Sequence, residues 1–331
     1  MARSRRRQFV ALVAGLAVAR WASAQPGKVL RVGSFVPERN SAIHTMLTEP
    51  LLRRMSELGY RAGRDFVFET EYVPLGSSDE AYAQAYRKLA ERKVDILFAF
   101  GLEAALKGAL AASSSTPIVM VAINWDPVAK GYVRSLRASG SNVTGVVFRE
   151  VELTTKRFQL LKDTFPGLKA VAVLWDRLSE DQWHEVQVSA PKLDLRVHGV
   201  EFEKPPYDYD AAFASILPEF RRAVVMLGSP RFALPERRNL PDAALRHRLP
   251  TMYVLREYVE LGGLMSYGPN YPQMAARAAD YMDRIAKGAK PGDMPIEQPG
   301  IFELVINART AKVLALSIPQ HILLRADSVI T

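Results

Sequence analysis

The feature that most constrains the fold is an alternation of short apolar runs with amphipathic segments. Short runs rich in β-branched residues are typical of buried strands, and apolar residues at three- to four-residue spacing are typical of helices. The predicted order begins with strand Leu30–Val36, helix Ser41–Leu58, strand Phe66–Val73, helix Glu80–Glu91, strand Asp95–Phe100, helix Leu102–Ala112 and strand Pro117–Val121. This order predicts a parallel sheet with helices on both faces.

The same rhythm starts again after a polar stretch rich in glycine and serine, Ser135–Gly145. The second series is helix Leu153–Phe165, strand Ala170–Trp175, helix Gln182–Lys192, strand Leu195–Phe202, helix Tyr207–Phe220, strand Ala223–Leu227, helix Pro235–His247 and strand Thr251–Leu255. A strand Leu264–Tyr267 and a helix Gln273–Lys287 follow. The pattern therefore predicts an α/β protein with two Rossmann-like lobes, each built on a parallel sheet.

Domain boundaries follow from the position of the polar stretch. We expect residues 25–122 plus 268–300 in the first lobe, and residues 123–267 plus 301–331 in the second. The hinge of crossing strands is then expected near residues 122–124, 145–148 and 264–268.

The N-terminus has the pattern of an export signal. Arg3 and Arg5–Arg7 are followed by the apolar run Phe9–Ala19, which is too short to span a bilayer as a stable helix. Ala22-Ser23-Ala24 then matches a small-x-small cleavage pattern, so we expect a signal peptide over residues 1–24 and cleavage after Ala24. Arg6-Arg7 also fits a twin-arginine signal, and the general secretory route remains the alternative. The expected location is the periplasm.

Composition excludes several classes of function. Removal of residues 1–24 takes five arginines and no acid, which lowers the net charge from +9 to +4. No basic patch with interleaved aromatic residues remains, so we expect no nucleic-acid partner. The chain has no cysteine, and its five histidines lack ligand spacing, so we expect no metal site. The loops that bind nucleotides and the Gly-x-Ser-x-Gly elbow are also absent, which argues against a cofactor and against an enzyme.

Ligands of open parallel sheets bind beyond the carboxyl ends of the strands. Two such edges that face each other would enclose one site between the lobes, where small-molecule sites are common. The residues at or just beyond predicted strand ends are Ser34, Phe35, Gly101, Glu103, Asn124, Asp126, Asp176, Ser229, Tyr267 and Asn270.

Each of these positions also has a purely structural interpretation. Glu103 complements a helix dipole wherever it points, whereas in the cleft it would repel a carboxylate and favour a cationic or hydroxyl-rich ligand. Asp126 can bind an amine or simply cap the turn before Pro127. Asp176 and Ser229 can likewise serve as turn or helix caps. Tyr267 and Asn270 can belong to a strand–turn–helix that serves packing alone.

Several segments resemble a known family. They are GGLMSYGPN at Gly262–Asn270, MPIEQP at Met294–Pro299, FELVIN at Phe302–Asn307, LGYRAG at Leu58–Gly63 and NVTG at Asn142–Gly145. These segments are similar to those of ABC transporter substrate-binding proteins of the TrpX type, which bind tryptophan or tyrosine. The resemblance extends over nearly the whole chain after the signal peptide and implies a type I periplasmic-binding fold.

The resemblance implies a periplasmic solute-binding protein, monomeric, that binds an amino acid or related small organic solute between its lobes. Its protein partner would be an ABC permease in the inner membrane. The resemblance also favours Tyr267 and Asn270 as residues that line the cleft. One position departs from the family, which often has a threonine or serine where this chain has Leu102. A sensor for a membrane receptor and an enzyme on the same scaffold remain alternatives.

Overall fold

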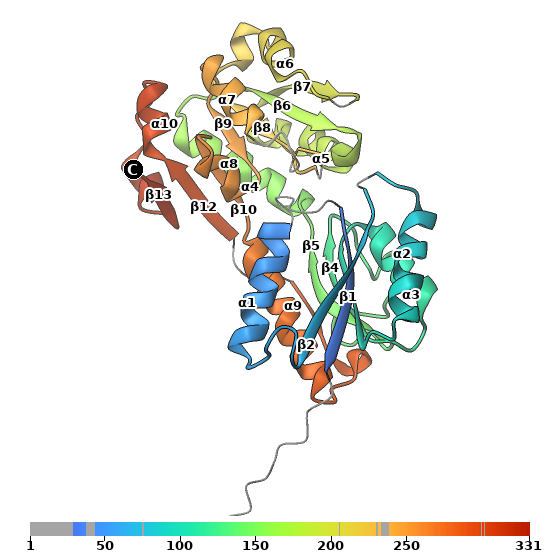
Figure 1. Cartoon of the computed structure of the whole chain (residues 1–331). Helices are drawn as coiled ribbons and strands as arrows, with labels where there is room; N and C mark the ends of the chain where they lie inside the picture. Colours follow the sequence, from blue (N-terminus) through green and yellow to red (C-terminus); the bar gives the residue numbers. More distant parts are fainter. Residues whose placement is uncertain are drawn as a thin grey trace, which may run out of the picture.

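The computed structural model describes residues 29–37, 44–74, 76–204, 206–229, 231–232, 238–298, 300 and 302–331. The chain forms two lobes, each a sheet covered by helices (Figure 1). The predicted signal peptide and its cleavage position after Ala24 lie outside the described residues.

The first lobe is built on a six-stranded sheet in which all strand pairs are parallel. The strand order is β11 (Ile296–Glu297), β5 (Val143–Phe148), β4 (Ile118–Ile123), β3 (Ile96–Gly101), β1 (Leu30–Val36) and β2 (Phe66–Tyr72). Helices α2 (Asp79–Glu91) and α3 (Glu103–Ala112) bury their apolar faces on one side of the sheet. Helices α1 (Glu49–Glu57) and α9 (Tyr271–Ala286) cover the other side.

The second lobe is built on a seven-stranded sheet in the order β13 (Ser328–Ile330), β12 (Phe302–Asn307), β10 (Met265–Pro269), β9 (Thr251–Tyr253), β8 (Val224–Met226), β6 (Ala170–Asp176) and β7 (Arg196–Phe202). Its strands pair in parallel except β12, which runs antiparallel to β10. Helices α4 (Val151–Thr164) and α5 (Glu180–Ser189) cover one face. Helices α6 (Tyr209–Ser215), α7 (Asn239–Arg246) and α8 (Arg256–Glu260) pack on the other.

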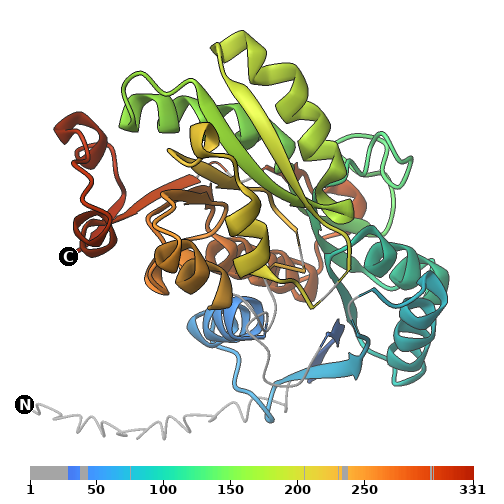
Figure 2. The ribbon, with the colours of Figure 1, turned by 90° about the horizontal axis from the view of Figure 1, so that it is seen from above.

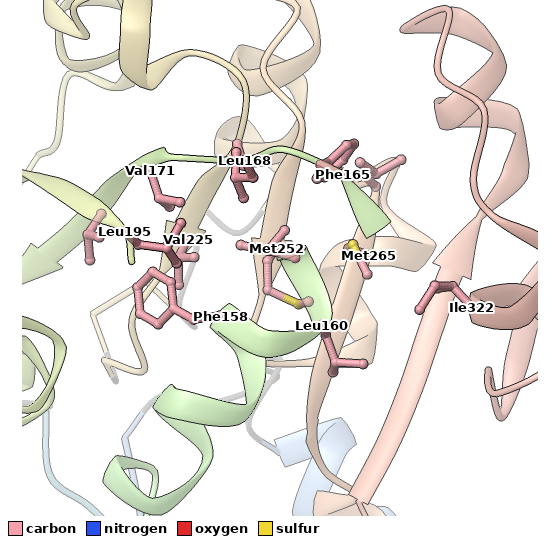
Figure 3. Packing of buried hydrophobic residues seen from close by; sticks show 14 of the residues in the cluster. Phe158, Leu160, Phe165, Leu168, Val171, Leu195, Val225, Met252, Met265 and Ile322 are labelled. Carbon is pink, nitrogen blue, oxygen red and sulfur yellow. The ribbon is translucent and has the colours of Figure 1, made fainter. Parts of the chain in front are cut away.

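The core under α4 shows why the predicted alternation holds. Phe158 on α4 is fully buried. Figure 3 shows its ring directed towards Val225 in β8 and Leu195, the residue before β7. The strand residues come from runs such as Val171–Leu174, which are buried on both faces of the sheet because helices cover both. Continuous apolar runs in the sequence therefore correspond to central strands.

Helix ends differ from the predictions where proline intervenes. The predicted helix Ser41–Leu58 is a π-helical turn at His44–Thr48 followed by α1, which begins with Pro50 in its first turn. The predicted helix Tyr207–Phe220 stops at Ser215, and Pro218 starts a separate 3-10 turn. Helix α7 begins at Asn239, while residues 233–237 lie outside the described part. Helices α8, α10 (Ala308–Val313) and α11 (Gln320–Leu323) were not predicted.

Strand β5 corrects the predicted boundary at residue 122. The prediction placed residues 123–267 in the second lobe, but Val143–Phe148 pairs in parallel with β4 and belongs to the first sheet. The polar stretch before it is a loop within the first lobe, fixed where the Asn142 amide donates to the carbonyl of Thr116 at 2.7 Å. Gly145 makes this pairing possible, because a Cβ there would collide with the carbonyl oxygen of Met120.

The chain passes between the lobes at three places, two of which lie near predicted hinge positions. The connections run from β5 to α4, from β10 to α9 and from β11 to β12. Residues 122–124 were predicted as a crossing but connect two strands of the same sheet, so that prediction is wrong. The third crossing was missed because β11 and β12 were not predicted.

The C-terminal strands β12 and β13 extend the second sheet, which is the lobe predicted for residues 301–331. Seen from above, the C-terminal segment (red) lies at the side of the molecule away from α2 and α3 (Figure 2). Among the described helices, none is both long and apolar enough to cross a bilayer.

Candidate functional site

A cavity of about 290 Å³ lies between the lobes, at the carboxyl ends of strands from both sheets. From the first lobe it is lined by residues at or just after the ends of β1, β3 and β4, and from the second by residues just after the ends of β8 and β9. The lining residues are Phe35, Pro37, Met46, Phe100, Gly101, Leu102, Glu103, Ile123, Asn124, Trp125, Glu150, Leu178, Gly228, Ser229, Val254, Leu255, Tyr258 and Tyr271. The walls are mainly apolar, with few polar groups.

Aromatic side chains from both lobes form much of this lining, and Trp125 and Tyr258 are each held by a hydrogen bond. The indole Nε1 of Trp125 donates to the carbonyl of Gly101 at 2.7 Å, and its ring meets Tyr132 edge-on with centroids 5.9 Å apart. On the opposite lobe, Tyr258 donates its hydroxyl to the carbonyl of Phe232 at 2.6 Å. Because the indole N–H of Trp125 and the hydroxyl of Tyr258 both have partners within the protein, these rings present apolar surfaces to the cavity.

Glu103 lines the cavity at the start of α3, but its charge is compensated. Gly101 takes a positive φ of 79° to turn the chain from β3 into the helix. The Glu103 carboxylate accepts from the Tyr132 hydroxyl at 2.6 Å and lies 3.3 Å from the Lys130 ammonium. Burial by itself would raise the pKa of Glu103, but the hydrogen bonds from Tyr132 and Lys130 and the charge of Lys107 lower it below the usual value.

Glu150 is the buried acid of the site. It precedes α4 at the crossing from β5, and its Oε2 lies 2.6 Å from Nη2 of Arg157. Both side chains are inaccessible, with exposed fractions of 1% and 0%. Arg157 also donates from Nε to the carbonyl of Tyr267 on β10 at 2.7 Å. This buried pair therefore links two of the three crossings between the lobes.

The second carboxylate oxygen of Glu150, Oε1, has no hydrogen-bond partner. An unpaired buried carboxylate oxygen is costly, because it has lost water without gaining a donor. Burial raises the pKa of Glu150, and the charge and hydrogen bond of Arg157 oppose this only in part. Glu150 belongs to the cavity wall, so this covered oxygen is a candidate acceptor for a ligand donor that reaches it from the cavity.

A second cavity of about 310 Å³, which we call the vestibule, adjoins the first. The two share Glu103, Asn124, Trp125 and Glu150 in their walls. The other residues of the vestibule wall are Asp126, Lys130, Arg149, Val151 and Asp181. The site thus has a mainly apolar inner part and a charged outer part.

The structure brings six of the ten predicted site residues to these two cavities. Phe35, Gly101, Glu103, Asn124 and Ser229 line the inner cavity, and Asp126 lines the vestibule. Asn124 uses its side-chain oxygen to accept from the backbone N–H of Glu150 at 2.8 Å. Asp126 caps its own turn, accepting from the N–H groups of Val128 and Ala129 at 2.8 and 3.0 Å, as its structural interpretation predicted.

Four predicted site residues do not line the cavities. Ser34 is buried in the sheet and donates to the carbonyl of Phe98 at 2.9 Å. Asp176 lies behind the wall, where its carboxylate accepts from Ser229 at 2.7 Å and so orients that hydroxyl. The Tyr267 ring packs on Phe302, with centroids 6.2 Å apart. Asn270 caps α9 by accepting from the N–H of Gln273 at 2.8 Å.

Sequence reasoning missed Glu150, Tyr258 and Tyr271. Glu150 follows β5, which was expected only as a hinge strand near residues 145–148 and not as a strand of the first sheet, so Glu150 was not counted among the strand-end residues. Tyr271 stands one residue after the predicted Asn270 and enters the cavity while Asn270 caps the helix. Tyr258 lies on the unpredicted α8.

Comparisons with known proteins agree with this geometry. The model of the family described as ABC transporter substrate binding protein matches residues 51–330. The chain belongs to this family of ABC transporter substrate-binding proteins. A curated relative, the tyrosine-binding protein of Clostridioides difficile (strain R20291), is 22% identical over 294 residues, which cover 84% of this chain and 81% of the relative.

Two solved structures share the fold. A conserved domain protein from Vibrio cholerae has a TM-score of 0.77 and 23% identity, covering 92% of this chain and all of that one. The ABC domain in complex with L-Trp from Streptococcus pneumonia has a TM-score of 0.74 and 20% identity over 92% of this chain and 100% of its own. This substrate-binding protein therefore has the type I periplasmic-binding fold that its sequence predicted. Among the described residues, no group of three or more His, Cys, Asp or Glu side chains could hold a metal ion.

Proposed function

We propose that this substrate-binding protein works in the periplasm, captures a small organic amine or amino acid between its lobes, and delivers it to an ABC permease in the inner membrane. The observation that carries the proposal is the buried, unpartnered Oε1 of Glu150, a residue that lines the mainly apolar cavity between the lobes. An ammonium group would donate a hydrogen bond to this oxygen and would place a positive charge beside the carboxylate.

The size and lining of the cavity support a ligand of amino-acid size. Ligand pockets typically measure about 300–1,000 Å³ and combine apolar walls with a few placed polar groups. At about 290 Å³ this cavity stands at the lower end of that range. Its aromatic lining suits a ligand with a ring, in keeping with the tyrosine and L-Trp named for the two relatives.

Transport by this protein would depend on closure of the lobes. The three crossings form the hinge, and the ligand favours the closed form to the extent that it binds that form more tightly. The basic, then apolar N-terminus with its Ala22-Ser23-Ala24 pattern supports export. We expect a monomer that binds stoichiometrically and shows no turnover.

The direct test is a thermal-shift screen of the exported chain with amino acids and their amines, followed by calorimetry on the hits. We expect saturable binding at one site per chain and a higher melting temperature with bound ligand. A hit that the protein chemically converts would favour an enzyme. A full panel of amines and amino acids that leaves the melting temperature unchanged would contradict the proposed ligand class.

The affinity for such a ligand should depend on pH through Glu150. Only the ionised carboxylate attracts the ammonium, and burial raises the pKa of this group. We therefore expect the dissociation constant to rise as the pH falls through this raised pKa, by up to about tenfold per pH unit. Calorimetry from pH 8 down to the ordinary glutamate pKa of 4.5 measures this slope, because the raised pKa lies above that value. A dissociation constant that stays constant over this whole range would contradict an ammonium–Glu150 contact.

A further inference from the structure

The charged groups around the two cavities indicate which kind of amine this protein selects. Among the described residues that line the inner cavity, none is lysine, arginine or histidine, and the charged ones are Glu103 and Glu150. Arg157 lines neither cavity. It directs Nη2 to Glu150 and Nε to the carbonyl of Tyr267, and its Nη1 is buried without a hydrogen-bond partner. In the described part of the chain, the inner cavity therefore presents no cationic side chain to a ligand carboxylate.

The start of α3 is also poorly suited to a carboxylate. A helix N-terminus can hold an anion through its free N–H groups and its dipole. Here the first residue of the helix is Glu103, whose charge already complements that dipole, and the cap residue Leu102 has no hydroxyl to donate. An anionic ligand group at this position would face the Glu103 carboxylate.

The vestibule has an excess of negative charge. Its described lining carries the acids Glu103, Asp126, Glu150 and Asp181, and the cations Lys130 and Arg149. Both cations already lie near these acids, because Lys130 is 3.3 Å from Glu103 and Arg149 is 3.9 Å from Asp126. A ligand carboxylate that extended outwards would meet more negative than positive charge.

Two of the neutral donors in the inner cavity are also occupied. The Ser229 hydroxyl donates to Asp176 at 2.7 Å, and the Tyr258 hydroxyl donates to the carbonyl of Phe232 at 2.6 Å. A carboxylate would lose its water in a cavity whose charged lining residues are the acids Glu103 and Glu150, which is unfavourable. An ammonium, in contrast, would meet Glu150 Oε1 and aromatic faces, both of which attract cations.

We infer that this protein selects cationic arylalkyl amines, which carry a ring and an ammonium but no carboxylate, over the amino acids with the same ring. The inference rests on the proposed function and deepens it, because it names the ligand class of the same site. The inferred ligand class differs from the amino acids, tyrosine and L-Trp, that are named for the two relatives.

The test compares matched ligands on the full exported chain by calorimetry. The pairs are tryptamine with L-tryptophan, tyramine with L-tyrosine and phenethylamine with L-phenylalanine, and the methyl ester of each amino acid is the third member. We expect each amine, and each ester, to bind at least about tenfold more tightly than the amino acid, because the carboxylate charge is the unfavourable element. Equal or tighter binding of the amino acids would overturn the inference.

Two further outcomes are informative. Tight binding of the amines with weak binding of both esters and amino acids would assign the selection to size and would overturn the charge argument. Absence of binding by every amine, ester and amino acid would contradict the proposed function itself, so the two failures can be told apart.

A charge variant provides an independent check. Glu103→Gln removes the acid at the start of α3, and we expect it to narrow the preference for tryptamine over L-tryptophan by about three- to tenfold. Glu180→Gln is the matched control, because Glu180 occupies the first position of α5 and lines neither cavity. A preference that Glu103→Gln leaves unchanged, or that both variants change equally, would count against the inference.

Discussion

Glu150→Gln is expected to raise the dissociation constant of an amine ligand by at least about thirtyfold and to lower the free energy of unfolding by about 3–5 kcal/mol. Binding weakens because the neutral amide carries no charge to attract an ammonium. Stability falls because Arg157, with an exposed fraction of 0%, keeps its charge in a buried place without a counter-ion. Calorimetry measures the first effect and urea denaturation the second.

The two effects can be separated by a second variant. In Glu150→Gln/Arg157→Met the buried charge is gone, and we expect most of the lost stability to return while ligand binding stays weak. Glu152→Gln is the matched control on the same helix, because this acid is 54% exposed and lies outside both cavities. If the stable double variant bound an amine as tightly as the native chain, Glu150 would have no role in recognition.

Gly145→Ala is expected to lower the free energy of unfolding by about 2–6 kcal/mol, combining backbone strain with an overpacked contact. The residue has a φ of 138°, and an added Cβ would collide with the carbonyl oxygen of Met120 in the neighbouring strand. Relief of the collision would require β4 and β5 to move apart. Denaturation of the purified variant measures the loss.

Gly131→Ala is the control that measures the cost of backbone strain at a positive φ without the collision. Its φ of 77° is also positive, but nothing lies within 4 Å of the position that a Cβ would take. We expect it to cost only about 1–2 kcal/mol. If both variants lost the same stability, the close approach of β4 and β5 at Gly145 would not be the reason for glycine there.

Much of the fold was predictable because central parallel strands and their helices have distinct periods. The runs Val171–Leu174 and Val119–Ala122 are buried throughout, as continuous apolar runs predict. Strand β5 was expected only as a hinge strand and not as part of the first sheet, because its apolar residues follow directly on a polar loop and are interrupted by Thr144 and Gly145. Strand β12 runs antiparallel to β10, and no local pattern in FELVIN distinguishes that direction.

The sequence predicted the residues that line the site only where they lie at the ends of predicted strands. Gly101, Asn124 and Ser229 line the cavity because each lies at or just after the end of a strand that was predicted to within two residues. Asn270 and Tyr271 differ by one position along the chain, and the cap geometry of α9 decided which one enters the cavity. The pairing of Glu150 with Arg157 depends on how α4 packs beside β10, which is not a local property.

From its sequence alone, this chain's class was determined: two α/β lobes with a ligand cleft, in the family of ABC transporter substrate-binding proteins, because periodicity and family motifs are local signals. Only the tertiary structure decided the lobe of β5, the three crossings and the unpartnered oxygen of Glu150. These depend on which distant surfaces meet, and burial then decides which polar groups keep a partner and which remain available to a ligand.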